Sequence, residues 1–72
     1  MIVYDKKKVG RSIASRRAAL GMTQAELAKE CGLSQSAIQG YESAEFGPSL
    51  KNAVIIANAL GVTATYLLRI PN

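Results

Sequence analysis

The stretch from Gln24 to Ser43, QAELAKECGLSQSAIQGYES, constrains the fold of this chain more than any other segment. Ala28 and Gly32 are small, so two helices can approach closely at Ala28 and the chain can turn at Gly32 in a left-handed conformation. The spacing of the apolar residues predicts two short packed helices joined by a tight turn, and these residues are Leu27, Cys31, Leu33, Ile38 and Tyr41.

The second of these helices, predicted from Gln35 to about Ser43, carries polar side chains on its exposed side. Ser34 can cap its N-terminus, and Gln35, Ser36 and Gln39 follow on that side. Short polar side chains form hydrogen bonds with the edges of DNA bases, and a glutamine can pair with both N6 and N7 of adenine. We therefore expect Gln35, Ser36 and Gln39 to read bases, with Gln35 as the leading candidate.

The segment resembles the helix-turn-helix of lambda-type phage repressors and Cro, in the xenobiotic-response-element family of bacterial regulators. The similarity covers roughly residues 9–69 and continues past the motif through Pro48, Ser49, Leu50, IANALGV (56–62) and TYLL (65–68). It implies an all-α fold, a compact five-helix domain over residues 1–72 with the motif at 24–43. It also implies a transcriptional repressor that binds a two-fold operator in double-stranded DNA as a homodimer.

A second class of function stays open, namely a protein-interaction module such as an antitoxin that also binds its own promoter. Antitoxins usually need an extra surface or tail to hold the toxin, and this chain ends at Asn72, soon after the last predicted helix. Two origins also stay open. The chain can be a complete small protein similar to Cro, or the N-terminal domain of a longer repressor.

Capping and stop signals outside the motif predict the other helices. Asp5 can cap a first helix that runs to about Leu20 and stops at Gly21, with an inward stripe of Val9, Ile13, Arg17 and Leu20. Thr23 and Glu26 have the spacing of a capping box at the start of the motif.

The second half of the chain carries similar signals. Pro48 cannot continue a helix, and Ser49 can cap a fourth helix over residues 50–60. The buried side of that helix should hold Leu50, Ala53, Ile56, Ala57 and Leu60. Gly61 ends this fourth helix. Thr63 can cap a short last helix that carries Leu67 and Leu68, and Pro71 prevents its further extension.

Arg17 is the charged residue on the inward stripe of the first helix. A buried guanidinium must find a carboxylate, because an unpaired charge there costs several kcal/mol. Glu42 follows Tyr41 in the motif and is equally close to the core. We predict an ion pair between Arg17 and Glu42, which the resemblance also implies; the alternative is that Arg17 extends to solvent.

The charge of the chain is uneven. The formal net charge is +4, and between residues 6 and 29 only Glu26 opposes the basic residues Lys6, Lys7, Lys8, Arg11, Arg16, Arg17 and Lys29. This imbalance favours a polyanionic partner, and the polar motif favours nucleic acid over a membrane surface. A merely solvated basic helix is the alternative.

Contacts with the DNA backbone would fix the register of the motif without reading sequence. By resemblance, Gln24 contacts a phosphate and braces Gln35; the alternative is a plain surface residue at a helix start. The other candidates for phosphate contacts are Ser43, Lys51, Asn52, Arg11 and Arg16, of which Lys51 could equally be an unengaged lysine in solvent.

Gly40 departs from the family pattern, because many relatives place a long polar side chain at this reading position. A glycine offers no base contact, so the base pair below it is unread, or a methyl group or water fills the space. Glycine inside a helix costs ~1 kcal/mol relative to alanine, which suggests that close approach to DNA or packing offsets the loss.

A two-fold operator requires a dimer. The candidate dimer surface is Ile55, Thr65, Tyr66 and Ile70, since relatives often have a polar residue at the position of Ile55. The alternative is that Ile55 belongs to the core. The leading residues Ile2, Val3 and Tyr4 could pack on the domain or on a partner.

The composition argues against several other functions. With no histidine and only Cys31, a zinc site, a histidine-based catalytic relay and an internal disulfide are excluded, and Cys31 should be a buried thiol. The chain shows no apolar run of membrane-spanning length and no signal peptide, so we expect a cytoplasmic protein without membrane contact. We expect no enzyme activity, no cofactor and no small-molecule substrate.

Overall fold

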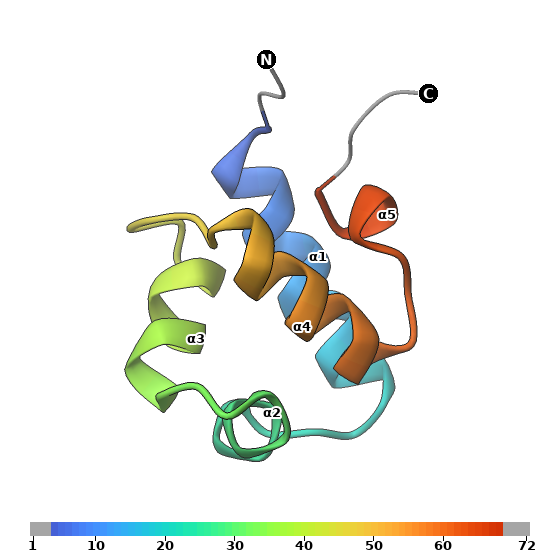
Figure 1. Cartoon of the computed structure of the whole chain (residues 1–72). Coiled ribbons are helices and arrows are strands. Elements are labelled where there is room, and N and C mark those ends of the chain that lie inside the picture. Colours follow the sequence, from blue (N-terminus) through green and yellow to red (C-terminus); the bar gives the residue numbers. More distant parts are fainter. Residues whose placement is uncertain (1–3, 69–72) are drawn as a thin grey trace.

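The computed structural model describes residues 4–68 and contains five α-helices (Figure 1). These are α1 (Lys6–Ala19), α2 (Gln24–Cys31), α3 (Gln35–Glu42), α4 (Leu50–Leu60) and α5 (Ala64–Leu68). The predicted all-α, five-helix domain is confirmed, and the helices begin and end close to the predicted residues.

The predicted capping residues start the helices. Asp5 Oδ1 accepts a hydrogen bond from the Lys7 N–H at 2.9 Å. In the capping box, Thr23 Oγ1 accepts from the Glu26 N–H at 3.0 Å and Glu26 Oε1 accepts from the Thr23 N–H at 2.9 Å. The helices α3, α4 and α5 begin in a similar way, with hydroxyl groups that accept hydrogen bonds from backbone N–H groups. These hydroxyl groups belong to Ser34, Ser49 and Thr63.

Left-handed backbone conformations end two helices, follow α1 at Gly21 with φ of 70°, and shape one loop. Gly32 ends α2 with φ of 66° and Gly61 ends α4 with φ of 71°, as their positions in the sequence predict. Ala44, in the loop between α3 and α4, has φ of 62° although it carries a Cβ. A left-handed conformation costs a residue other than glycine roughly 1–2 kcal/mol, so Ala44 is held there by its surroundings.

The core lies where the five helices meet. Its largest fully buried side chains come from all of them: Val9, Ile13, Leu27, Ile38, Ile56, Leu60, Leu67 and Leu68. Cys31 is a free, buried thiol, as predicted, and burial raises its pKa. The side chains are mostly branched aliphatic groups, and each contributes roughly 1.5–3 kcal/mol when it leaves water.

Two leucines predicted to be buried are exposed. Leu20 is 45% exposed and is the C-cap of α1, where its N–H bonds to both Arg16 O and Arg17 O. Leu50 is 60% exposed. It stands in the first turn of α4 on the same outer edge as Val54, four residues later, which is also exposed.

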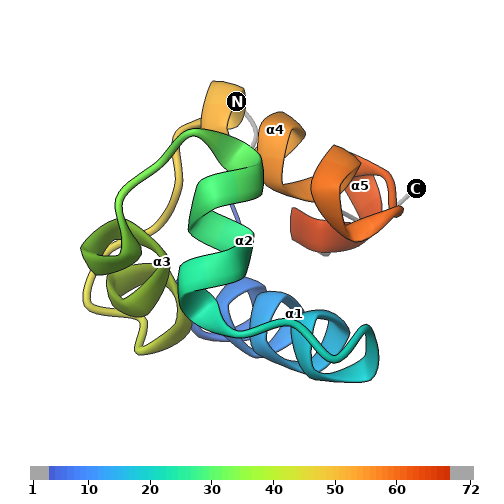
Figure 2. The same cartoon turned by 90° about the horizontal axis from the view of Figure 1, so that it is seen from below.

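The helices α3 and α5 lie on opposite sides of the domain. Figures 1 and 2 show α3 at one edge and α5 at the other, with α1, α2 and α4 between them. Within residues 4–68, no helix is long and apolar enough to cross a membrane.

Candidate nucleic-acid interface

The outer face of α3 consists of short polar side chains. Ile38 and Tyr41 point inward into the core, and α3 packs on both α1 and α2. At 100° per residue, Gln35, Ser36 and Gln39 fall on the side away from them, and all three are exposed. The structure therefore brings the three predicted base-reading residues together on one accessible helix face, beside the turn at Gly32.

The inner side of α3 is fixed by the predicted ion pair between Arg17 and Glu42. Arg17 Nε donates to Glu42 Oε2 at 2.7 Å, and Arg17 Nη2 donates to Glu42 Oε1 at 2.9 Å. The third guanidinium nitrogen, Nη1, donates to Met22 O at 2.8 Å. The Arg17 side chain is 19% exposed and that of Glu42 is 9% exposed, so the alternative in which Arg17 extends to solvent is wrong.

The charge of Glu42 is stabilised in this position. Burial alone would raise the pKa of Glu42, but hydrogen bonds from Arg17 and Gln24, together with the Arg17 charge, hold it below its usual value. The same hydrogen bond with Glu42 raises the pKa of Arg17. Both groups are therefore ionised at neutral pH, and this pairing joins α1 to the C-terminal end of α3.

Gln24 also bonds to the carboxylate of Glu42. Its Nε2 donates to Glu42 Oε1 at 3.1 Å, which adds a third hydrogen bond to this carboxylate; the contacts of Gln24 with a phosphate and with Gln35 stay predictions. The cause is local geometry, because the capping box places Gln24 in the first turn of α2 and turns it toward the end of α3. Gln35 projects from the start of α3, a full helix length from Glu42.

Gly40 lies on the outer side of α3 and is nevertheless buried. The ring of Phe46 covers it so closely that a Cβ at residue 40 would overlap Cζ and would lie 2.7 Å from Cε1 and from Cε2. Packing, one of the two expectations for Gly40, thus explains why glycine is present. Sequence reasoning missed Phe46; the available signal was an aromatic residue in a polar loop shortly after an unexpected helical glycine.

One hydrogen bond links the end of α3 and the start of α4, the two segments that carry the next candidates. Ser43 is exposed, and its hydroxyl donates to Gly40 O at 3.2 Å. Lys51 is exposed in the first turn of α4. Asn52 is half-buried and its Nδ2 donates to the Tyr41 hydroxyl at 3.1 Å, which ties the start of α4 to α3.

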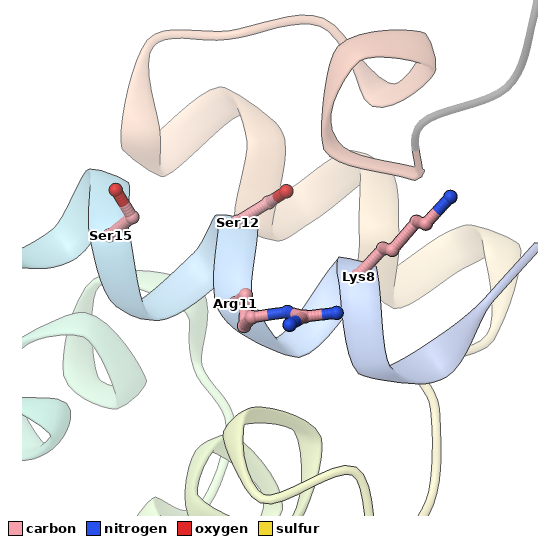
Figure 3. Close-up of a pocket in the computed structure, with 4 residues that line it drawn as sticks. All are labelled: Lys8, Arg11, Ser12 and Ser15. Atoms are coloured by element: carbon pink, nitrogen blue, oxygen red, sulfur yellow. The ribbon is translucent and has the colours of Figure 1, made fainter.

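The two arginine candidates on α1 have different surroundings. Arg11 is exposed and lines an open depression with Lys8, Ser12 and Ser15, and Figure 3 shows its guanidinium extending along α1 toward Lys8. Arg16 instead donates from Nε to Leu60 O at 2.9 Å, at the C-terminal end of α4. A cation at this end of a helix is favourable, because the last carbonyl groups carry partial negative charge.

The candidate dimer surface is only partly exposed. Ile55 is half-buried and packs against the core, whereas Thr65 is exposed and Tyr66 is 48% exposed. Val54, beside Ile55, is 41% exposed. Ile70, Ile2 and Val3 lie outside the described residues, and Tyr4 packs on the domain.

These features define a class of protein: a helix-turn-helix domain whose second motif helix has an exposed face of polar side chains. The family model of that name, helix-turn-helix, matches residues 13–67, and the chain belongs to this family.

Relatives and solved structures agree with that assignment. The chain is 39% identical over 56 residues to the cryptic phage CTXphi transcriptional repressor RstR of Vibrio cholerae, and this match covers 78% of the chain and 50% of RstR. The chain thus spans about half the length of this relative. It superimposes on the P22 c2 repressor, in complex with a synthetic operator, with a TM-score of 0.81, 36% identity and coverage of 85% of this chain and 92% of the repressor.

A third similar protein is the restriction-modification controller protein C.AhdI of Aeromonas hydrophila. Its TM-score is 0.83 at 33% identity, and the match covers 88% of this chain and 96% of C.AhdI. The resemblance to phage repressor domains found in the sequence is therefore confirmed.

Proposed function

We propose that this chain is a sequence-specific DNA-binding transcriptional repressor that binds a two-fold operator as a homodimer. The observation that carries the proposal is the outer face of α3, where Gln35, Ser36 and Gln39 are exposed while the opposite face is fixed in the core. A helix of this kind enters the major groove and places its N-terminal residues against base edges. The operator complex of the similar P22 c2 repressor and the description of RstR as a transcriptional repressor support it.

Residues beside α3 supply the proposed contacts with phosphates. The hydrogen bond between Asn52 and Tyr41 holds the first turn of α4 against α3, so the neighbouring Lys51 and the nearby Ser43 flank the reading face. Gln24 contributes its backbone N–H at the positive end of α2, since its side chain is engaged with Glu42.

The remaining phosphate candidates differ in their freedom to reach DNA. Arg11 is exposed and keeps its candidate role. For Arg16 we propose a structural role, because its guanidinium already caps α4. The net charge of +4 suits a polyanionic ligand, and binding of this kind weakens as salt rises. The proposal requires no cofactor, metal or small-molecule substrate.

A homodimer follows from the short length of the reading helix. α3 has eight residues, and a single helix of this size reads too few base pairs for specificity. The proposed contact surface combines Ile55, Thr65 and Tyr66 with the exposed Val54, on the part of the domain away from α3. In a two-fold dimer the same surface is used by both copies.

Selection from random duplex DNA tests the proposed function. Wild type, Gln35→Ala and the control Asn58→Ala, which removes an exposed amide from α4, are compared at one salt concentration. We expect wild type and Asn58→Ala to enrich the same two-fold site, and Gln35→Ala to lose its preference for adenine at one position in each half-site. Weak binding that is blind to sequence in all three proteins would reject the proposal and favour a protein-interaction module.

A further inference from the structure

The loop between α3 and α4 places an aromatic ring on the reading face of α3. Gly40 follows Ser36 by four residues, one helical turn, so the two residues occupy the same outer side of α3. The surface above Gly40 is formed by the Phe46 ring, which remains 45% exposed. The outer side of α3 therefore continues from polar side chains into an apolar surface that the helix itself does not supply.

The Phe46 ring is held in place from several directions. It meets the Tyr41 ring edge to face, with the ring centroids 5.6 Å apart and an interplanar angle of 89°. Backbone bonds fix the loop on the same glycine, because the Glu45 N–H donates to Gly40 O at 3.0 Å. A geometry of this kind is a preferred arrangement of two aromatic rings and stabilises the pair beyond its buried area.

The far end of the loop is also fixed. The Tyr4 hydroxyl donates to Pro48 O, and Pro48 is buried. Tyr4 packs so closely on Gly47 that a Cβ there would lie 2.9 Å from Tyr4 Cε1. Phe46 is thus a partly exposed ring in a loop that is fixed at both ends. A loop fixed in this way holds a contact residue in its binding orientation before the ligand arrives.

The chemistry of the loop favours a base over a phosphate as the partner of this ring. Residues 43–50, SAEFGPSL, contain no lysine or arginine, and the neighbour Glu45 is exposed and acidic. A carboxylate repels phosphates, so the middle of this loop, between the phosphate candidates Ser43 and Lys51, is unsuited to contact the DNA backbone. An apolar ring in the major groove matches the C5-methyl group of thymine, which is the apolar feature that base edges present there.

We propose that Phe46 is a specificity-determining residue that contacts the C5-methyl group of a thymine from the loop after α3, and that Gly40 is glycine so that the ring can lie against the helix. The inference rests on the proposed function and extends it to a residue outside the motif at 24–43. It adds an apolar contact in each half-site to the hydrogen bonds expected from Gln35, Ser36 and Gln39.

The test replaces each thymine of the selected operator by deoxyuridine, one position at a time in both half-sites, which removes only the methyl group. Burial of one methyl group is equivalent to ~0.8 kcal/mol, or about a fourfold change in Kd for each contact. We expect one thymine position at which deoxyuridine weakens wild-type binding by about that factor per half-site. Phe46→Ala should bind the thymine operator as weakly as wild type binds the deoxyuridine operator, and should not distinguish the two.

Two further variants separate the contact from general damage to the loop. Phe46→Leu keeps an apolar side chain, so we expect it to retain part of the response to deoxyuridine. Gly40→Ala keeps Phe46 but forces the ring away from α3, and should lose the response at the same position. Melting temperatures of all variants, measured by circular dichroism, show that the binding was measured on folded protein.

The outcomes distinguish this inference from the proposed function. If wild type enriches a site that depends on Gln35 but no thymine responds to deoxyuridine, the role of Phe46 is wrong and the function stands. The same holds if Phe46→Ala keeps the full response of wild type. If wild type enriches no site, both the function and the role of Phe46 are rejected.

Discussion

Arg17 and Glu42 lie 25 positions apart in the sequence and share two hydrogen bonds, of 2.7 Å and 2.9 Å, that join α1 to the end of α3. Two parallel bonds from a guanidinium to a carboxylate define orientation as well as distance. Because Gln24 adds a bond from α2 to the same carboxylate, Glu42 connects three helices at one point. The first two predictions concern this carboxylate.

Replacing Glu42 by Ala should destabilise the domain strongly, because it leaves the largely buried Arg17 without its carboxylate. Removing one partner of a fully buried pair costs 3–5 kcal/mol, and since the Arg17 side chain is 19% exposed we expect about 2–3 kcal/mol. For a domain of this size, that loss lowers the melting temperature by roughly 10 °C or more. Thermal unfolding followed by circular dichroism measures it, with the exposed Glu30→Ala as the control. An equal melting temperature for both variants would contradict the role of the pair.

Stability should fall in acid partly through Glu42. Its pKa is lower in the folded chain than in the unfolded chain, so the ionised carboxylate stabilises the fold above about pH 4.3, and this contribution is lost as the pH falls through the folded-state pKa. We expect the melting temperature of wild type to drop more steeply between about pH 5 and pH 3 than that of Glu42→Gln. Asp5 and Glu26 also have lowered pKa values, through hydrogen bonds from the backbone N–H groups of Lys7 and Thr23, so some dependence on pH should persist in the variant.

Ala44→Gly should stabilise the protein. The backbone of Ala44 has φ of 62°, which glycine adopts without the steric cost of a Cβ, although glycine gives the unfolded chain more freedom. The net gain should be about 0.5–1 kcal/mol, or a rise of a few degrees in melting temperature. Ala18→Gly, on the exposed side of α1, is the matched control and should lower stability by up to ~1 kcal/mol. A decrease for both variants would mean that Ala44 is not strained.

Lys51→Ala should weaken DNA binding without changing the selected sequence. One lost phosphate contact reduces the slope of log K against log salt by ~1, because one fewer counterion is released. Titrations of operator and of unrelated duplex DNA at several salt concentrations measure the slope, with Asn58→Ala as the control. If the slope is that of wild type, Lys51 makes no phosphate contact.

Ile55→Lys should reduce the cooperativity of operator binding, because it places a charge at the proposed dimer surface. Ile55 is half-buried, so the substitution can also destabilise the fold. The melting temperature of the Ile55→Lys variant is therefore measured as well. Leu20→Lys adds the same charge at an exposed leucine on α1 and should leave cooperativity intact. Comparison of binding to a full operator and to a single half-site gives the cooperativity. Equal values for wild type and Ile55→Lys would remove this residue from the interface.

Local signals in the sequence were sufficient for the helices. Caps such as Thr23 and Ser34 and stops such as Gly32 act within a few residues, so the sequence shows them directly. The pairing of Arg17 with Glu42 was also predictable, because a charge on an apolar stripe must be neutralised within the core. The outer face of α3 followed from helical periodicity alone.

Contacts between distant segments were harder to predict. The bond of Gln24 to Glu42, the position of Arg16 at the end of α4 and the ring of Phe46 on Gly40 all depend on how elements meet in space. Leu20 and Leu50 match the apolar pattern of their helices, but they stand in the terminal turns, where neighbouring helices no longer cover them. Helical periodicity predicts which way a side chain points, but it does not show whether another segment packs against that side chain.

The contacts that hold α3 in place determine whether the protein or the DNA changes shape in the proposed complex. Glu42 fastens the helix to α1 and α2, Asn52 fastens Tyr41 to α4, and the Phe46 ring covers Gly40. The outer face of α3, when held this firmly, loses little conformational entropy on binding. It also cannot adjust its shape to a DNA groove that fits it poorly. In the proposed dimer, we therefore expect the duplex to bend or twist so that both half-sites fit the two α3 helices. Base pairs that neither subunit touches should then influence affinity through the stiffness of the DNA between the half-sites.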